Sequence, residues 1–548
     1  MSLARNVIVQ TTFTLGSRLL GFARDLALNA RFGGQGPLMD AWTKALWLPN
    51  LFRRLFAEGA FAQAFVPVFA KTLQQEGQAE AEKMASQALA FIMVMVVAFS
   101  ILLELVMPQL MPVILYTYVD DPEVMRIAVL MTQLTTPYLA CMTLASLLSG
   151  VLNTKEKFAL SSGAPILLNV VTLVPLLLVQ DRTMAAYWAA AAVTIAGVLQ
   201  GVMLWWGVRR MGIKLSVGLP VLTSSVKRVL ALAIPGAIAG GGVQINSAVS
   251  NVLTGTDVGA SSVLYNAERL YQLPIGLIGV AVGMALVPRL SRYFADTDHT
   301  SADKAMDDGI TLSMAFTLPA ALALLIMPYF IIDGIVTRGA FSSADAHRTA
   351  EVLRQFAWGV PAFVLAKVFT PPFFARHRTK QPAIFTGITV ALNVVLGVAL
   401  WFGLPALSKY LGSVWFGLPT TGDGMDGAIG LAIATSICGW INVFLLAGTL
   451  AREKVYVVSA AAWGRLARLG LACAAMGAFI TVCALEYSFL QRALLSKEIA
   501  AVLVASIGFA IFLVCALLFR AVTIAEIRSS LRREKGVPGV ALPGGGEG

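Results

Sequence analysis

Charged residues are scarce in this chain of 548 amino acids, since Asp, Glu, Lys and Arg together make up only 13% of it. Soluble domains carry about 25% charged and roughly 45–50% apolar residues. In this sequence 57% of the residues are hydrophobic. So little charge excludes a water-soluble enzyme and favours a protein that lies mostly within a membrane.

Histidine and cysteine are rare as well. The three histidines, His299, His347 and His377, stand alone in polar connections, so the sequence offers no cluster of metal ligands. The five cysteines fall in apolar stretches without paired spacing, which excludes a disulfide framework and a zinc knuckle. The motifs GxxxxGKS/T, HExxH and GxSxG are missing too. We therefore expect no cofactor and no ATP hydrolysis.

Long apolar stretches make up most of the chain. A membrane-spanning helix needs about 20 mostly apolar residues, and fourteen segments meet that description, from residues 8–30 to residues 498–521. Proline and glycine interrupt many of these segments, which transmembrane helices tolerate when neighbouring groups satisfy the freed backbone. The sequence thus predicts an all-α polytopic membrane protein with 14 transmembrane helices.

Lys and Arg outnumber Asp and Glu by 41 to 30, and they are unevenly placed. One alternate set of connections holds groups such as Arg209, Arg210 and Lys214, whereas the other set holds isolated cations such as Arg182. The positive-inside rule then places both termini in the cytoplasm. In the tail, residues 526–548, a basic stretch is expected to bind the lipid surface rather than nucleic acid, and the glycine- and proline-rich end to be disordered.

An internal repeat divides the chain. Leu168–Val171 reads LNVV and recurs 224 residues later as Leu392–Val395, and Pro137 matches Pro361 at the same offset. Each repeat would hold six helices. Because an even number of spans returns the chain to its starting side, the two halves would run parallel about an axis along the membrane normal.

The repeat defines the expected domain organisation. We predict a first lobe over residues 1–215, a second lobe over residues 216–455 and a separate pair of helices over residues 456–525. Two helical lobes with a cleft between them are typical of alternating-access transporters.

Seven arginines fall inside predicted spans, and two of them, Arg126 and Arg354, lie near helix ends, where their side chains can reach the membrane surface. The other five are Arg18, Arg24, Arg53, Arg54 and Arg269. An arginine that faces lipid at the bilayer centre costs about 2.5–3.5 kcal/mol, so these side chains are expected to face a hydrated cleft or a partner. A surplus of cations in such a cleft favours an anion, and guanidinium groups bind phosphate oxygens in pairs. The alternative is a set of internal salt bridges that only hold the helices together.

Acidic residues close in sequence could pair with some of these cations. Asp40 and Lys44 are four residues apart, as are Arg54 and Glu58, so each pair can meet within one helix. These pairs would reduce the positive surplus of the cleft without abolishing it.

The remaining acids are direct neighbours of arginines. Asp25 follows Arg24 and Glu268 precedes Arg269. Adjacent side chains on a helix diverge, so we expect Arg24 and Asp25 to point apart. Lys44 and Arg269 each lie five residues before a repeat-related proline, which predicts that they face each other from opposite walls of one cleft.

Several motifs together resemble one family. They are SRLLGFARD at Ser17–Asp25, LPNLFRRLFAEGAF at Leu48–Phe61, AFVP at Ala64–Pro67, YNAERL at Tyr265–Leu270 and LPIG at Leu273–Gly276. The chain is similar over roughly residues 5–520 to the MurJ (MviN) family of bacterial lipid II flippases, within the multidrug/oligosaccharidyl-lipid/polysaccharide exporter superfamily.

The resemblance implies fourteen helices in two six-helix lobes, with the final pair forming a groove for a lipid tail. It implies a protein of the bacterial inner membrane, not an enzyme. Its substrate would be lipid II, the undecaprenyl-diphosphate-linked peptidoglycan precursor, moved from the cytoplasmic to the periplasmic leaflet through a cationic cavity. Membrane phospholipids would surround it, and cell-wall synthesis proteins are further partners that the resemblance leaves open.

Functional residues carry over by position. The cavity arginines of the family correspond to Arg18, Arg24, Arg53 and Arg269, and its functional acids to Asp25, Asp40 and Glu58. Lys44, Arg54 and Glu268 complete the expected cavity and gate. Some members bind sodium through an acid on the seventh helix, but the seventh span here has no Asp or Glu. Membrane potential or protons therefore remain as drivers beside sodium.

Three other functions are weighed against this one. A drug or cation exporter of the same superfamily would need unpaired carboxylates in its cavity, whereas here the imbalance is positive. A membrane enzyme acting on polyprenyl diphosphates would need a histidine-containing cluster that the isolated histidines do not supply. A scaffold for cell-wall enzymes would leave the intramembrane arginines without a purpose.

Overall fold

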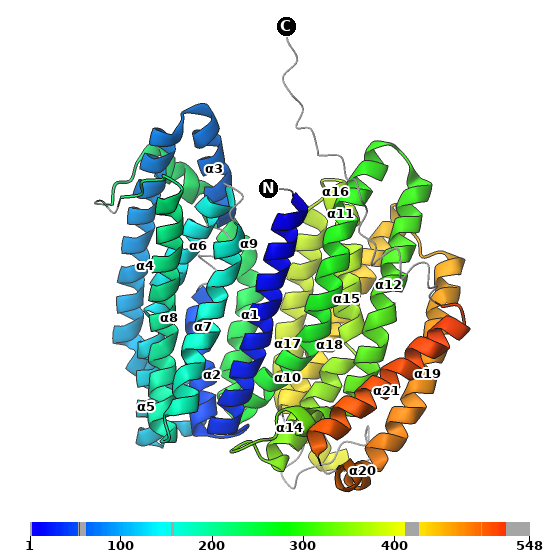
Figure 1. Cartoon of the computed structure of the whole chain (residues 1–548). Helices are drawn as coiled ribbons and strands as arrows, with labels where there is room; N and C mark the ends of the chain where they lie inside the picture. Colours follow the sequence, from blue (N-terminus) through cyan, green and yellow to red (C-terminus); the bar gives the residue numbers. More distant parts are fainter. Residues whose placement is uncertain are drawn as a thin grey trace.

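The computed structural model describes residues 3–52, 54, 62–154, 158–216, 218, 220–411, 427–494 and 496–521. Over these residues the chain is built of helices joined by short connections, with no strand. Figure 1 shows two upright helical bundles side by side, with α1 (Leu3–Phe32) between them. The all-α prediction is confirmed.

The helices that follow α1 form the first bundle. Their bounds are α2 (Pro37–Phe52), α3 (Ala62–Gln75), α4 (Gln78–Ile114), α5 (Pro122–Thr135), α6 (Tyr138–Thr154), α7 (Phe158–Leu178) and α8 (Arg182–Arg210), with a short 3-10 turn at Tyr116–Tyr118. Within this bundle α1 packs against α7, α7 against α8 and α2 against α5.

The second half begins with α9 (Ser224–Thr254). It continues through α10 (Ala260–Pro274), a π-helical turn at Ile275–Gly279, α11 (Val280–Ala295), α12 (His299–Ile326), α13 (Pro328–Ile335), α14 (Ser343–Ala357), α15 (Val360–Phe369), α16 (Pro371–Ala375), α17 (Lys380–Leu411) and α18 (Gly427–Arg452). Here α17 packs against α18, and α10 against α14.

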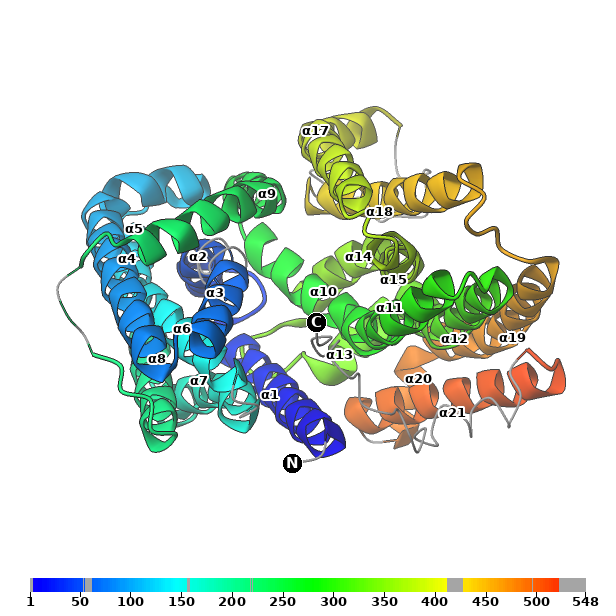
Figure 2. The same ribbon diagram turned by 90° about the horizontal axis from the view of Figure 1, so that it is seen from above.

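Three helices complete the described chain: α19 (Ala460–Leu485), α20 (Tyr487–Leu494) and α21 (Lys497–Leu518). α19 and α21 pack against each other, and α19 also covers α12. Figure 2 places this group at the outer edge of the second bundle, away from the first. The lobe boundaries at residues 215 and 455 stay predictions.

Proline and capping residues determine where several helices begin. The Asp121 carboxylate accepts hydrogen bonds from the backbone N–H groups of Glu123 and Val124, directly before α5 opens with a proline. α14 begins with a capping box, in which Ser342 and Asp345 each accept from the other's backbone N–H. These local signals fix where α5 and α14 begin.

α9 belongs to the second half of the sequence but packs against both bundles. It contacts α3 and α4 of the first and α17 of the second. Val226 and Val229, near its start, are buried in the same apolar cluster as Leu148 and Val151 of α6. α9 therefore links the two lobes.

The repeat-related asparagines join neighbouring helices, as the default interpretation of polar residues in spans predicts. Asn169 of α7 donates to the backbone oxygen of Ser17 in α1 at 2.9 Å. Asn393 of α17 lies 3.4 Å from the hydroxyl of Thr435 in α18.

By length and composition, ten helical segments in the described chain could cross a membrane. The exact number of fourteen stays a prediction. α1, which carries Arg18, Arg24 and Asp25, is not among the ten. α2 and α10, with 16 and 15 residues, are also outside that set. α9 is outside that set as well, and the candidate site is built on it together with α1, α2 and α10.

Candidate functional site

Asp25 of α1 is the point at which charged groups of the two lobes meet. Its Oδ1 accepts hydrogen bonds from Arg24 at 2.7 Å and from the Tyr265 hydroxyl at 3.0 Å. Its Oδ2 lies 3.2 Å from Nε of Arg269. Arg24 and Asp25 are both buried, whereas the Arg269 side chain keeps 45% exposure. One carboxylate is thus shared by two guanidinium groups.

The expectation that Arg24 and Asp25 point apart is wrong. The long arginine side chain turns back, so that both Nε and Nη2 reach the neighbouring carboxylate, at 3.1 and 2.7 Å. Burial between the lobes favours this pairing, because an uncompensated charge in an apolar environment is costly.

Tyr265 orients the second arginine. It lies four residues before Arg269 on α10, so both side chains project from one face of the helix. The Arg269 guanidinium lies 4.8 Å from the centre of the Tyr265 ring and donates to its hydroxyl at 3.0 Å. The tyrosine therefore connects Arg269 to Asp25.

A cavity of about 520 Å³ lies beside this cluster, between the two lobes. The charged residues in its described wall are Arg24, Arg54, Glu268 and Arg269, so arginines outnumber acids there. The polar wall opposite comes from α9 and includes Gln244, Asn246, Ser247, Ser250, Asn251 and Thr254. The cavity can accommodate an anion with a polar extension.

Arg18 lies outside the wall of this cavity. It is exposed on α1, and its guanidinium approaches the backbone of Gly276 in the π-helical turn so closely that a Cβ there would collide with Nη1. A π-helical turn is frequent at functional sites. Arg18 thus touches the second lobe at the turn that follows α10.

Lys44 does not face Arg269 across the cavity, contrary to the expectation from the repeat. It is 1% exposed, and its ammonium donates to the backbone oxygen of Asn251 and to the Thr254 hydroxyl. Both acceptors lie in the last turn of α9, where backbone carbonyls are unpaired and the helix dipole attracts a cation. Lys44 therefore caps α9.

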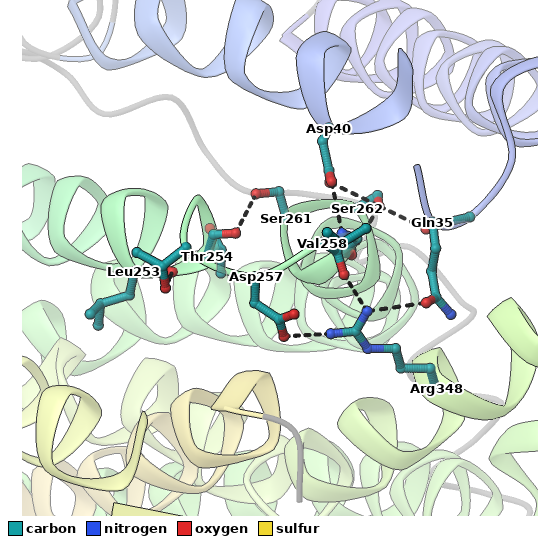
Figure 3. Close-up of polar contacts among 12 residues, drawn as sticks. Gln35, Asp40, Leu253, Thr254, Asp257, Val258, Ser261, Ser262 and Arg348 are labelled. Carbon is teal, nitrogen blue, oxygen red and sulfur yellow. Dashed lines mark hydrogen bonds and ion pairs between the residues drawn. The ribbon is translucent and has the colours of Figure 1, made fainter. Parts of the chain in front are cut away.

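Asp40 binds the beginning of the next helix, α10, as Lys44 binds the end of α9. Its carboxylate accepts from the Gly259 backbone N–H at 2.7 Å and from the Tyr118 hydroxyl at 3.0 Å. It also accepts from the Ser262 hydroxyl at 3.3 Å (Figure 3). Gly259 is the N-cap of α10, where a negative charge is favourable. Asp40 and Lys44 bind partners outside α2 rather than forming the expected pair within it.

Further contacts close the lobes around this end. Arg348 of α14 pairs with Asp257 at 2.6 Å, reaches the Gln35 side chain at 3.1 Å and donates to the Val258 carbonyl (Figure 3). The Gly34 backbone N–H donates to Asp345 at 3.2 Å. The loop that follows α1 is therefore held against the start of α14.

An amide pair reinforces the same closure. Asn29 of α1 and Asn266 of α10 donate to each other's side-chain oxygen, at 2.7 and 2.9 Å, and both residues are buried. Each buried amide thus has both a donor and an acceptor contact in the pair, which favours the arrangement in which α1 and α10 touch.

Other predicted site residues are only partly placed. Arg54 is exposed and Glu268 half-buried in the cavity wall. Arg53 and Glu58 lie outside the described residues, so their roles stay predictions. Within the described chain, no group of three or more His, Cys, Asp or Glu residues is arranged to hold a metal ion.

Sequence reasoning missed the uncharged part of the site. Tyr265 could have been found from its spacing to Arg269. The α9 residues gave a weaker signal, because amide and hydroxyl side chains in a span are usually explained by bonds between helices. Only the folded arrangement shows that they line a cavity.

Comparison with known proteins places this geometry in context. The family model described as "Lipid II flippase MurJ" matches residues 29–504. A probable lipid II flippase MurJ of Rhizobium tropici is 35% identical over 546 residues, which cover 98% of each chain. The lipid II flippase MurJ of Burkholderia cenocepacia is 30% identical, over 83% of this chain and 85% of its own.

Solved structures share the fold. A lipid II flippase MurJ in an inward closed conformation superposes with a TM-score of 0.74 at 22% identity, covering 96% of this chain and 100% of its own. An inward-facing multidrug resistance transporter of the MATE family gives a TM-score of 0.64 at 12% identity, covering 82% of this chain and 98% of its own.

Proposed function

The chain belongs to the MurJ family, and from that premise we propose that it moves lipid II across the inner membrane, from the cytoplasmic to the periplasmic leaflet. The lobes would open alternately to either side of the membrane. The head group would enter the cavity between them while the polyprenyl tail stays in the lipid. Helices α19 and α21 would border the path of that tail.

The sharing of Asp25 by Arg24 and Arg269 carries this proposal. One carboxylate cannot neutralise two guanidinium groups, and both arginines also line the cavity. A diphosphate offers several oxygens that guanidinium groups bind in pairs, and it would supply the missing negative charge. In the empty protein, Asp25 would hold the two arginines in place for the substrate.

Opening and closing would depend on the contacts beyond the cavity. Asp40, Lys44 and Arg348 join the lobes at the end that follows α1. With the N-terminus in the cytoplasm, this closed end would face the periplasm. Binding of the anionic head group would draw Arg269 away from Asp25 and loosen the closure. α9 carries no acidic residue that could bind sodium, which favours membrane potential or protons over sodium as the driver of the cycle.

The test compares arginine variants in cells depleted of the native protein. Arg24→Ala and Arg269→Ala should each reduce flipping of labelled lipid II by more than tenfold, because each loses charge-assisted bonds made to the head group. The measurement is the leaflet-resolved accessibility of the labelled lipid, normalised to the amount of protein in the membrane.

Arg465→Ala is the matched control, because this arginine pairs with Asp308 away from the cavity. It should flip lipid II at the unaltered rate. Normal flipping by both Arg24→Ala and Arg269→Ala would contradict the proposal that these groups hold the substrate.

A further inference from the structure

α9 presents a polar stripe to the cavity. The stripe consists of six amide and hydroxyl residues, Gln244, Asn246, Ser247, Ser250, Asn251 and Thr254. Four of them, at positions 247, 250, 251 and 254, have the spacing that places side chains on one face of a helix. The stripe carries no charge, so it differs in chemistry from the arginines of the facing wall.

The two ends of the stripe are used differently. At the end nearest the Gly255 connection, Thr254 and the Asn251 carbonyl already bind Lys44. At the other end the Gln244 side-chain oxygen is buried and has no hydrogen-bond partner among the described residues. An unpartnered amide in such a place costs free energy. Gln244 also lines the cavity, so rotation of its amide would present this unpartnered acceptor to a ligand.

An aromatic ring stands beside this end of the stripe. Trp47 of α2 is half-buried, lines the cavity, and donates from Nε1 to the Ser247 hydroxyl at 3.1 Å. The hydrogen bond fixes the orientation of the indole, so its apolar face is held in the cavity wall next to polar side chains.

This combination suits a sugar. A saccharide ring has an apolar face of C–H groups and a rim of hydroxyl and acetamido groups, which match an aromatic ring and amide or hydroxyl side chains respectively. The cavity, of about 520 Å³, has the size that holds a compact polar ligand.

We infer that Trp47 and the α9 polar stripe bind the saccharide that is joined to the diphosphate. The inference rests on the proposed function. It assigns two parts of the head group, the diphosphate and the saccharide, to two different parts of the cavity wall. Arg24 and Arg269 hold the diphosphate, and α9 with Trp47 distinguishes a substrate with sugars from a polyprenyl diphosphate without them.

Two lipid probes test this division with the full chain in nanodiscs: lipid II, and undecaprenyl diphosphate without sugars. Gln244→Ala and Trp47→Ala should weaken the binding of lipid II by about tenfold, the loss of one good contact. They should leave the binding of undecaprenyl diphosphate unchanged, which also shows that the variants are folded. Trp47→Phe, which keeps a ring, should retain most of the lipid II affinity.

Ile245→Ala is the matched control, since Ile245 neighbours Gln244 on α9 but is 60% exposed and absent from the cavity wall. It should bind both probes like the unaltered protein. Equal weakening of both probes by Gln244→Ala and Trp47→Ala, or no weakening of lipid II, would overturn the inference. If the unaltered protein bound neither probe, the proposed function would fall together with the inference.

Discussion

Gly276 is the residue that allows Arg18 to reach the second lobe. A Cβ at this position would collide with the Arg18 guanidinium, which is the mobile end of a long side chain. Substitution would therefore move Arg18 rather than disrupt the backbone.

We expect Gly276→Ala to reduce lipid II flipping several-fold while leaving the melting temperature of the protein nearly unchanged. Gly279→Ala, in the same π-helical turn, is the control, because a Cβ there would meet Lys367 at an ordinary distance of 3.4 Å. Flipping and thermal unfolding would be measured for both variants. Equal flipping by the two would show that the position of Arg18 is unimportant.

At the scale of single residues, the charge pattern predicted the centre of the site. The cost of intramembrane arginines indicated Arg24 and Arg269, and the structure brings both to Asp25. The charge pattern could not predict the contacts of Lys44, because the position of Lys44 in the repeat says nothing about the backbone carbonyls at the end of α9. The partner that a lysine side chain binds depends on which helix ends lie near it in the folded protein, and only tertiary packing determines this.

At the scale of helices, the carboxylate of Glu453 joins α17 and α18 outside the membrane. Glu453, just after α18, accepts from Gln381 at 2.9 Å, Arg376 at 2.8 Å and Arg378 at 2.7 Å. The hydrogen bond from Gln381, then that from Arg376, holds the pKa of Glu453 below its ordinary value. This cluster ties the start of α17 to the end of α18.

The pH dependence of stability follows from that shift. Because the folded pKa is depressed, the contribution of Glu453 is present at neutral pH and is lost as the pH falls through the folded value. Glu453→Gln should therefore lower the melting temperature in detergent at neutral pH. Below about pH 4, the difference from the unaltered protein should shrink. A difference that is constant with pH would contradict this role for the carboxylate.

The long apolar stretches predicted the helices better than they predicted their interruptions. The apolar stretch that contains the LPIG motif, expected to be one span, is divided into α10, a π-helical turn and α11. Proline at 274 marks the division, but nothing in the hydropathy of the stretch indicates that Arg18 of another helix lies against the turn at Gly276. Hydropathy measures the membrane environment and not such contacts, so the breaks that shape the site were not predictable.

For the whole molecule, the buried amide pair offers a test of alternating access. Asn29 and Asn266 belong to different lobes and contact each other directly. If transport requires the lobes to separate here, a covalent bond between these positions should stop it. We expect the oxidised double variant Asn29→Cys with Asn266→Cys to lose flipping, and reduction to restore it.

Each single cysteine variant is the control for that experiment, since it weakens the amide pair without joining the lobes. Leaflet-resolved lipid II accessibility would be measured before and after reduction. Continued flipping by the cross-linked protein would show that α1 and α10 need not separate during transport.

α9 packs against both lobes, which limits how they can move. If the two lobes rotate relative to each other, they cannot both keep all their packing contacts with α9. The side chains of at least one lobe must then slide along this helix. Small apolar side chains on the packing surface of such a helix permit sliding, whereas a large side chain there would hinder it. If the lobes move relative to each other, one of them must therefore slide along the helix that we assign to sugar recognition.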